Sequence, residues 1–233
     1  TADAYGNGHS ERVMGKGLAE ERARVILATK GGWWYVDDVA YSDFSPIYLY
    51  RSLDASLKML GTDYVDLYQI HDPDAEAIKK GEIFEVLGRM KASGKVRHTG
   101  ASVDTVDEGL RCIEAGGLDV IQVYYSILDQ RPDPDLFAAA SSNGTGLVVK
   151  TPLGRGLLTG KYTRDSHFHK DDFRDQWQRE GKLAELLDKV DKIKELVGDR
   201  SPALAQTALR FVLSNPFVST AIPGAKTPEQ AEA

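Results

Sequence analysis

Residue types that can move protons recur in the first part of the chain: a tyrosine at position 5, a lysine at position 30 and a histidine at position 71. A tyrosine has an ordinary pKa of about 10 and is a poor acid at neutral pH, but a nearby ammonium favours its phenolate and so eases proton donation. A histidine can donate a hydrogen bond that orients an oxygen and stabilises charge developing on it. Tyr5, Lys30 and His71 could therefore protonate an oxygen as negative charge builds up there.

Lys30 and His71 each close an apolar stretch of the kind that forms a buried strand. Strands are predicted over residues 25–28, 64–70, 120–124, 147–149 and 217–222, with a weaker one over 96–100. Between the strands, apolar residues recur three or four positions apart and predict covering helices, as in the stripe Leu183, Leu186, Leu187, Val190, Ile193 and Val197. Strands that alternate with helices indicate an α/β fold with a parallel sheet.

Two α/β architectures compete, an open doubly wound sheet and a closed (β/α)8 barrel. An open nucleotide-binding sheet normally carries a glycine fingerprint after an early strand. Gly6 and Gly8 match its first glycines, but Glu11 stands at the third position. The glycine-rich segment over residues 154–162 does not have the spacing of a phosphate-binding P-loop either. The open form thus lacks its expected fingerprint.

The composition is that of a globular protein, with 233 residues, 42% of them hydrophobic and 27% charged, and we expect one domain over residues 1–233. The net charge of −6 comes from mixed acidic and basic residues without a basic stripe, so no nucleic-acid partner is predicted. No apolar run is long enough for a membrane span, and the polar N-terminus does not resemble a signal peptide, which predicts a cytoplasmic protein without membrane partners.

Two groups of potentially reactive side chains have simpler interpretations. Cys112 lies in an apolar helical pattern and is predicted to be a buried structural thiol. His167 and His169 precede Asp171 and Asp172, but the surrounding segment is polar and offers no rigid scaffold. We therefore expect a solvated loop there and no metal site.

Residues 1–6, Thr-Ala-Asp-Ala-Tyr-Gly, with Ser10 and Glu11, resemble the signature of aldo-keto reductases around their catalytic tyrosine. Residues 28–30 and 66–71 resemble the strand ends that carry the family's lysine and histidine, and further similar segments cover residues 60–64, 94–97, 100–102, 122, 152–162 and 222–225. The resemblance implies a (β/α)8 TIM barrel. It also implies NADPH-dependent reduction of an aldehyde or ketone to an alcohol by hydride transfer, with Tyr5 as proton donor beside Lys30 and His71.

The same resemblance implies where the cofactor binds. Ser102 and Gln122 would hold the nicotinamide carboxamide, the loop around Leu153 would follow the pyrophosphate, and Lys226 with Gln230 would contact the ribose and 2′-phosphate. The complete expected set is Ser102, Gln122, Lys150, Thr151, Leu153, Gly154, Gly156, Gly224, Lys226 and Gln230. The charge of Lys226 favours NADPH, with NADH possible.

This sequence departs from the family's pattern at several places. Val103 stands where the family often has asparagine, and Lys150 stands where it commonly stacks an aromatic ring on the nicotinamide. The family's catalytic aspartate immediately precedes the threonine of the tyrosine motif, so Asp3 is not that residue. Relative to the family, the barrel is expected to be incomplete at its first strand and helix and at its C-terminal end. A longer natural polypeptide is therefore expected; if the polypeptide ended at these residues, a homo-oligomer or loss of activity would be expected.

Two alternatives to carbonyl reduction stay open. Residues 43–46 and 71–73 resemble family members that oxidise aldose sugars, which suggests an NAD(P)-dependent sugar dehydrogenase. Some proteins of this fold instead bind the cofactor and act as regulatory subunits without turnover. Trp33, Trp34 and Tyr35 are predicted to wall a pocket for a small carbonyl or sugar substrate, with ordinary packing as the alternative. They do not choose between these substrates.

Overall fold

The computed structural model describes residues 1–198 and 201–232. These residues form two compact units. Unit 1 contains residues 1–123 and 133–147, and unit 2 contains residues 124–132 and the described part of 148–233.

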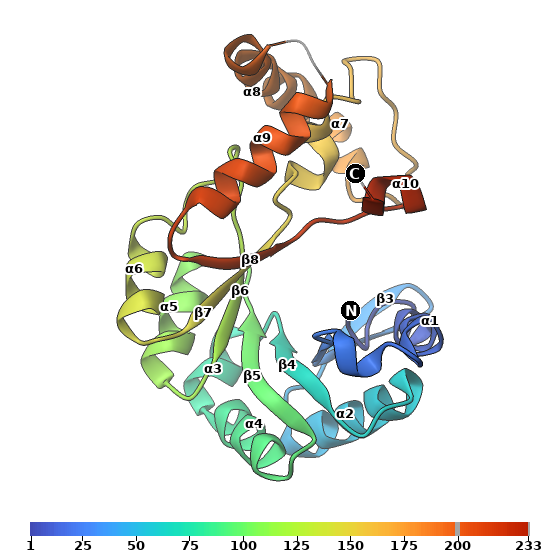
Figure 1. Ribbon diagram of the computed structural model, residues 1–233, viewed down its shortest axis with the longest axis vertical. Helices are drawn as coiled ribbons and strands as arrows, with labels where there is room; N and C mark the ends of the chain where they lie inside the picture. Colours follow the sequence, from blue (N-terminus) through green and yellow to red (C-terminus); the bar gives the residue numbers. More distant parts are fainter. Residues whose placement is uncertain (199–200, 233) are drawn as a thin grey trace. The chain divides into compact units, whose positions relative to one another are not determined.

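The sheet of unit 1 is built from parallel strands in chain order. Strand β1 (Ala28–Gly31) pairs with β4 (Val65–His71), β4 pairs with β5 (Val96–Ser102), and β5 pairs with β6 (Val120–Tyr124), whose last residue lies in unit 2. Helices occupy the connections, as Figure 1 shows: α2 (Pro46–Leu60), α3 (Ala75–Lys80), α4 (Glu82–Ala92), α5 (Val106–Ala115) and α6 (Asp135–Ser142). Strand β7 (Gly146–Lys150) follows α6. This repeat confirms the predicted α/β class and is the repeat of a (β/α)8 barrel.

The helices begin and end where local chemistry requires it. Ser45 caps α2 by accepting a hydrogen bond from the Tyr48 N–H, and Gly61 ends that helix with a φ of 66°. Thr105 and Glu108 form a reciprocal capping box at the start of α5. Ile83, Val86, Leu87 and Met90 recur three or four positions apart on α4 and are buried, and Cys112 on α5 is buried as predicted. The helical periods therefore give the inward faces correctly.

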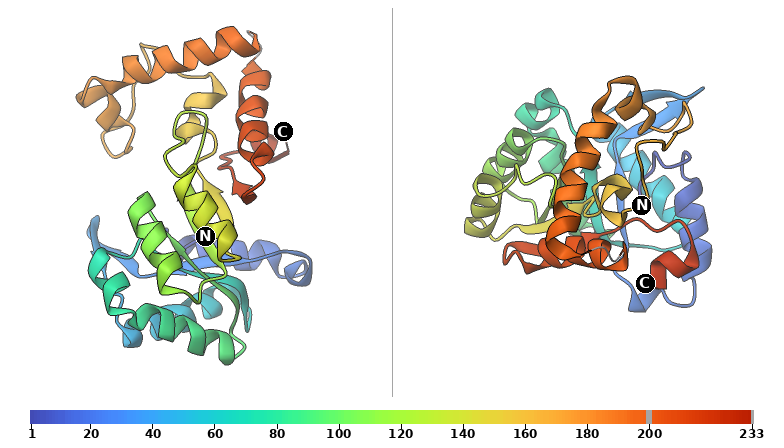
Figure 2. Two further views of the ribbon diagram at one scale, coloured as in Figure 1. Left: turned by 90° about the vertical axis from the view of Figure 1, so that its left-hand side faces the viewer. Right: turned by 90° about the horizontal axis from the view of Figure 1, so that it is seen from above.

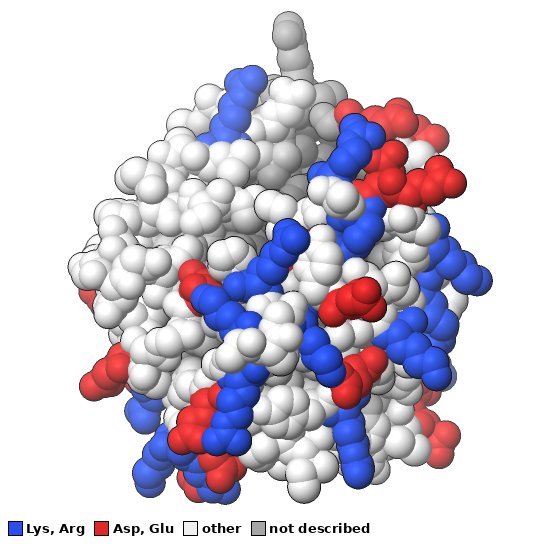
Figure 3. Space-filling view, turned by 60° about the horizontal axis from the view of Figure 1, so that its bottom comes forward, with Lys and Arg blue, Asp and Glu red and all other residues white. Residues whose placement is uncertain are grey.

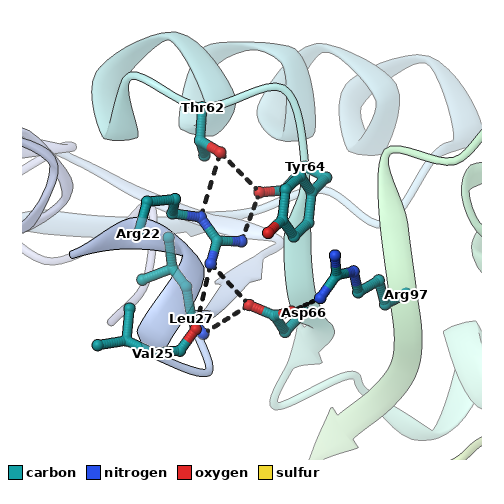
Figure 4. A network of polar contacts seen from close by, with 7 residues as sticks. All are labelled: Arg22, Val25, Leu27, Thr62, Tyr64, Asp66 and Arg97. Atoms are coloured by element: carbon teal, nitrogen blue, oxygen red, sulfur yellow. Dashed lines mark hydrogen bonds and ion pairs between the residues drawn. The ribbon is translucent and has the colours of Figure 1, made fainter. Parts of the chain in front are cut away.

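Strand β1 begins three residues later than predicted. The segment over 25–27 is held by side chains, because Arg22 Nη1 donates to Val25 O at 3.2 Å and Leu27 N donates to Asp66 Oδ2 at 2.9 Å. Figure 4 shows this network, in which Asp66 also pairs with Arg22 at 2.9 Å and with Arg97 at 2.8 Å. The network fixes the approach to β1, so the strand itself runs through Lys30 rather than ending before it.

Two further helices and a hairpin complete unit 1. Helix α1 (His9–Leu18) packs on α2, and a short 3-10 helix, η1 (Arg22–Arg24), follows it. Strands β2 (Trp33–Val36) and β3 (Val39–Ser42) form an antiparallel hairpin that the sequence analysis did not predict. Asp37 and Asp38 at its turn have φ values of 48° and 64°, the mirror-image turn that suits a two-residue hairpin loop.

Unit 2 is mainly helical. It contains the end of β7, η2 (Gly154–Thr159), α7 (Asp175–Arg179), α8 (Lys182–Val197), α9 (Ser201–Ser214), β8 (Val218–Ile222) and α10 (Pro228–Glu232). Figure 2 shows α8 running across one end of α9. The predicted stripe on α8 supplies the core, where Leu183, Leu187 and Val190 pack with Leu157 and Leu158 of η2.

Charged side chains of both signs share the surface. On the face in Figure 3, lysines and arginines are interspersed with acidic residues, as the mixed sequence predicts. The exposed ion pairs of unit 1 include that of Lys95 with Asp54 at 2.6 Å. Among the described helices, none combines the length and apolarity needed to cross a membrane.

Candidate functional site

Tyr5 lies in a tight turn between the N-terminal residues and α1. Gly6, Asn7 and Gly8 all have positive φ, at 60°, 48° and 81°, and an added Cβ at Gly8 would come within 2.0 Å of Met59 Sδ. The backbone therefore turns sharply straight after Tyr5. The tyrosine side chain itself is 48% exposed.

Lys30 lies within β1 and is buried, with only 4% of its surface exposed. Its Nζ donates a hydrogen bond to the Thr1 carbonyl at 2.9 Å and lies 5.1 Å from the centre of the Tyr5 ring. That distance lies within the range of a cation–π contact, which is stronger where water is excluded.

His71 is the last residue of β4, the strand beside β1. Its ring centre lies 5.7 Å from that of Tyr5, and the two planes are at 85°, an edge-to-face arrangement. The structure thus brings Tyr5, Lys30 and His71 together around the carboxyl ends of neighbouring parallel strands, although they are far apart in sequence. The sequence predicted this proximity.

Asp72 follows His71, and its carboxylate lies near both His71 and Ser102, the last residue of the neighbouring strand β5. Its φ is 45°, an uncommon conformation for a residue with a side chain. One carboxylate oxygen accepts a hydrogen bond from Ser102 Oγ at 2.8 Å, and the other lies 3.7 Å from His71 Nε2. Sequence reasoning did not select Asp72, but a charged residue immediately after a buried strand is the signal that marks it.

A second carboxylate belongs to Asp3, two residues before Tyr5 in the chain. Asp3 Oδ2 accepts hydrogen bonds from Ser52 Oγ at 2.8 Å and from Gly32 N at 3.2 Å, while Oδ1 accepts from Ala4 N at 2.6 Å. Burial raises the pKa of Asp3 to about 6, and the hydrogen bonds from Ser52 and Gly32 only partly offset this effect. A cavity of about 270 Å³ adjoins Asp3, with Trp33, Trp34, Tyr48 and Arg51 among its lining residues.

The residues predicted to form the substrate pocket lie on the β2–β3 hairpin. Trp33 Nε1 donates to the His71 carbonyl at 2.6 Å, which places this indole at the catalytic candidates. Trp34 stacks on Tyr41 with ring centres 5.8 Å apart and also contacts Tyr48. Tyr35 is 44% exposed, and its backbone is bonded by Asn7. Trp33 is therefore next to His71, whereas Trp34 packs within the hairpin and against α2.

The cofactor candidates of unit 1 are buried. Ser102 is 1% exposed and Gln122 is 4% exposed, and Gln122 Oε1 accepts a hydrogen bond from Gln69 Nε2 at 3.3 Å. The Gln69 Oε1 atom is buried and has no hydrogen-bond partner among the described residues. A buried amide oxygen of this kind fits an amide-bearing ligand, because it would gain a donor. The residue at the family's asparagine position, Val103, is fully buried.

Several cofactor candidates of unit 2 lie on a loop in which successive residues have positive φ. Thr151, Gly154 and Gly156 have φ values of 55°, 55° and 96°, and Arg155 between the glycines has a φ of 56°. Lys150 is 9% exposed, with Nζ 4.2 Å from the centre of the Tyr124 ring. Lys150, which stands where the family commonly has an aromatic residue, therefore packs on the ring of Tyr124.

The remaining cofactor candidates, Leu153, Gly224, Lys226 and Gln230, also lie in unit 2. Leu153 contacts the α8 core, whereas Gly224 is exposed, and an added Cβ there would meet nothing within 4 Å. Lys226 is exposed, and its N–H donates to Gln230 Oε1 at 2.8 Å. Cationic side chains at Lys226 and Arg155 suit a phosphate-bearing ligand. In the predicted solvated loop, His169 pairs with Asp171 at the surface at 3.1 Å.

The family model for the aldo/keto reductase family matches residues 1–233. The chain is 32% identical to aldo-keto reductase YhdN of Bacillus subtilis, over all of this chain and 72% of that protein. It is 30% identical to the NADH-specific methylglyoxal reductase of Escherichia coli, over 99% of this chain and 74% of that protein.

The structure is similar to that of the glycerol dehydrogenase AKR11B4 from Gluconobacter oxydans, with a TM-score of 0.85 and 30% identity over 99% of this chain and 72% of that one. The solved relatives have the TIM-barrel fold, which agrees with the strand order of unit 1. The matched family, the fold of the solved relatives and the reaction class predicted from the sequence therefore agree. The chain belongs to the aldo/keto reductase family, whose members are NAD(P)H-dependent oxidoreductases.

Proposed function

We propose that the protein reduces an aldehyde or ketone to an alcohol with NADPH, and that Tyr5 donates the proton. The observation that carries this proposal is the contact of Tyr5 with both Lys30 and His71 within unit 1. The half-exposed Tyr5 ring is accessible to a small molecule, while Lys30 is shielded from solvent. A small carbonyl compound is the substrate that this arrangement suits.

Each side chain has a separate task. Negative charge develops on the carbonyl oxygen as the carbon accepts a hydride, and Tyr5 gives its phenolic proton to that oxygen. The Lys30 ammonium, 5.1 Å from the Tyr5 ring centre, stabilises the phenolate that remains. His71 donates a hydrogen bond to the same oxygen and so fixes the orientation of the substrate. A bound nicotinamide supplies the hydride, because side chains do not carry one.

Each of the two units contains residues that would contact that cofactor. In unit 1, we assign the carboxamide to Ser102 and Gln122; this is supported by the bond from Gln69 to Gln122 and by the buried Gln69 amide oxygen, which has no hydrogen-bond partner among the described residues. In unit 2, the positive-φ loop around Gly154 and the exposed Lys226 suit the phosphates. The methylglyoxal reductase relative is described as NADH-specific, so the preference for NADPH rests here on Lys226.

The test compares wild-type protein with Tyr5→Phe in steady-state oxidation of NADPH across a panel of aldehydes, ketones and aldoses. We expect kcat to fall about 100-fold or more in the variant, the usual contribution of a positioned general acid. Tyr50→Phe on α2 is the matched control, because it removes another exposed phenol far along the sequence from the cluster. Retention of wild-type turnover by Tyr5→Phe would refute the proposal.

The same panel separates the alternatives. Running it with NADP⁺ and aldoses detects sugar oxidation, in which Tyr5 accepts the proton instead of donating it. A protein that binds NADPH tightly but turns over no compound in either direction would instead be a cofactor-binding regulator.

A further inference from the structure

We propose that Asp3 is a positioning residue for Tyr5. Its carboxylate accepts hydrogen bonds that join two segments: the turn containing Tyr5 and the end of the strand containing Lys30. This inference rests on the proposed function of Tyr5. It assigns Asp3 no contact with substrate or cofactor.

The hydrogen bonds of Asp3 join the two segments directly. Its N–H donates to Lys30 O at 2.9 Å, and its carbonyl accepts from Gly8 N at 2.8 Å. Its side chain accepts from Gly32 N at 3.2 Å, just beyond β1, and from Ala4 N at 2.6 Å, next to Tyr5. One residue thus links the end of β1 with both sides of the Tyr5 turn.

A buried hydroxyl relay holds the Asp3 carboxylate in place. Tyr68 Oη donates to Ser52 Oγ at 3.2 Å, and Ser52 Oγ donates to Asp3 Oδ2 at 2.8 Å. Burial raises the pKa of Tyr68, so its phenol stays protonated and remains a donor. Gly31 makes room for this relay, because an added Cβ would come within 2.0 Å of Tyr68 Oη and 2.6 Å of Ser52 Oγ.

The relay matters because Tyr5 lies on a turn next to Asp3, and the position of that turn sets the position of the Tyr5 ring relative to Lys30 and His71. The ring is 48% exposed, and its turn contains successive residues with positive φ. A displacement of about 1 Å in a reacting group can lower the rate about 100-fold. Loss of the Asp3 anchor is therefore expected to affect kcat more than cofactor binding.

Asp3 is surrounded by ionisable groups from several elements: Glu11 on α1, Lys30 on β1, Asp43 before α2, Tyr48 and Arg51 on α2, and Tyr68 on β4. The adjoining cavity of about 270 Å³ gives the carboxylate access to solvent protons. An ionised carboxylate can accept all of the side-chain hydrogen bonds described, whereas a protonated one gives up acceptor capacity. Protonation in mild acid should therefore loosen the Tyr5 turn.

The experiment measures kcat per NADPH-binding site for wild type, Asp3→Ala, Asp3→Asn and Tyr5→Phe. We expect Asp3→Ala to lower kcat about 10- to 100-fold with NADPH affinity within about twofold of wild type. Asp3→Asn keeps one acceptor oxygen, as the protonated carboxyl group does, so it should recover only part of that loss and have a kcat near the low-pH value of wild type. It should also lack the fall in kcat near pH 6 that we expect for wild type.

Ser56→Ala is the matched control, because this serine lines the same cavity from the same helix and its buried hydroxyl has no hydrogen-bond partner among the described residues. Ser52→Ala is the second anchor variant and covers the case in which Asp3→Ala does not fold. It should lower kcat in the same direction, whereas Ser56→Ala should leave kcat unchanged.

The outcomes are distinguishable. If Tyr5→Phe keeps wild-type turnover, the proposed function fails. If Tyr5→Phe loses turnover while Asp3→Ala and Ser52→Ala keep wild-type kcat per binding site, only the positioning role fails. An unchanged fall near pH 6 in Asp3→Asn would likewise overturn it.

Discussion

Asp3 has a pKa in the folded protein that its position in the sequence does not indicate. It sits partly buried beside Glu11, which is 1% exposed, and this setting opposes ionisation. Carboxyl groups with pKa values shifted by burial in this way cluster at functional sites. The family motifs identify Tyr5, Lys30 and His71 from the sequence alone. The role proposed for Asp3 rests instead on its contacts with Gly32 and Ser52, which are remote in sequence.

Asp3 should make stability depend on pH in a defined direction. Its pKa in the folded protein is about 6, above the ordinary value of 3.8, so its favourable contribution is full below about pH 4 and is lost as pH rises through 6. The total change is up to about 3 kcal/mol. Urea denaturation should therefore show Asp3→Asn gaining stability relative to wild type between pH 4.5 and 7.5. A variant-to-wild-type difference that is constant over this range would contradict the assignment.

At the scale of elements, sequence periodicity located most strands and some of the helices but not what fixes their ends. The start of β1 is displaced because Asp66 and Arg22 bond the backbone before it, and such long-range side-chain contacts leave no periodic signal. The β2–β3 hairpin was missed because its turn is Asp37-Asp38 rather than the usual asparagine–glycine pair. The aromatic and β-branched residues that flank that pair on both sides are the signal that could have identified it.

The Asp66 network should be a major stabilising feature of unit 1. Burial alone would raise the pKa of Asp66, but the Leu27 N–H and the guanidinium groups of Arg22 and Arg97 hold that pKa below its ordinary value. Removing one partner of a buried pair costs about 3 kcal/mol or more, so Asp66→Ala should lower the free energy of unfolding by that amount.

Asp54→Ala is the control for that measurement, because Asp54 pairs with Lys95 at the surface and should cost less than about 1 kcal/mol. The stabilisation from Asp66 is present above its unfolded pKa and is lost as pH falls through its folded pKa. Equal effects of the two substitutions in urea denaturation at pH 7 would be inconsistent with a dominant Asp66 network.

At the scale of the whole molecule, the family resemblance predicted the fold class and reaction class, because strand-end motifs in a fixed order specify both. Cofactor preference could not be predicted as firmly. It depends on a few exposed charges such as Lys226 and on the packing of Lys150 against Tyr124, which no motif encodes. The substrate also depends on how the hairpin bearing Trp33 shapes the region near His71.

NADPH should stabilise the folded protein, by about 2.7 kcal/mol at a concentration 100 times its Kd. Lys226→Ala should reduce the thermal shift with NADPH while leaving the shift with NADH unchanged, since only NADPH carries the 2′-phosphate. Lys192→Ala on α8 serves as the control for loss of one positive charge. Equal reduction with both cofactors would show that Lys226 does not read the 2′-phosphate.

The central claim is that Tyr5 transfers the proton in the chemical step. Single-turnover reduction of an aldehyde by preformed complexes of NADPH with wild type and with Tyr5→Phe isolates that step from cofactor binding and product release. The predicted result is a rate about 100-fold or more lower in Tyr5→Phe at unchanged NADPH affinity. A wild-type single-turnover rate in Tyr5→Phe would contradict the account.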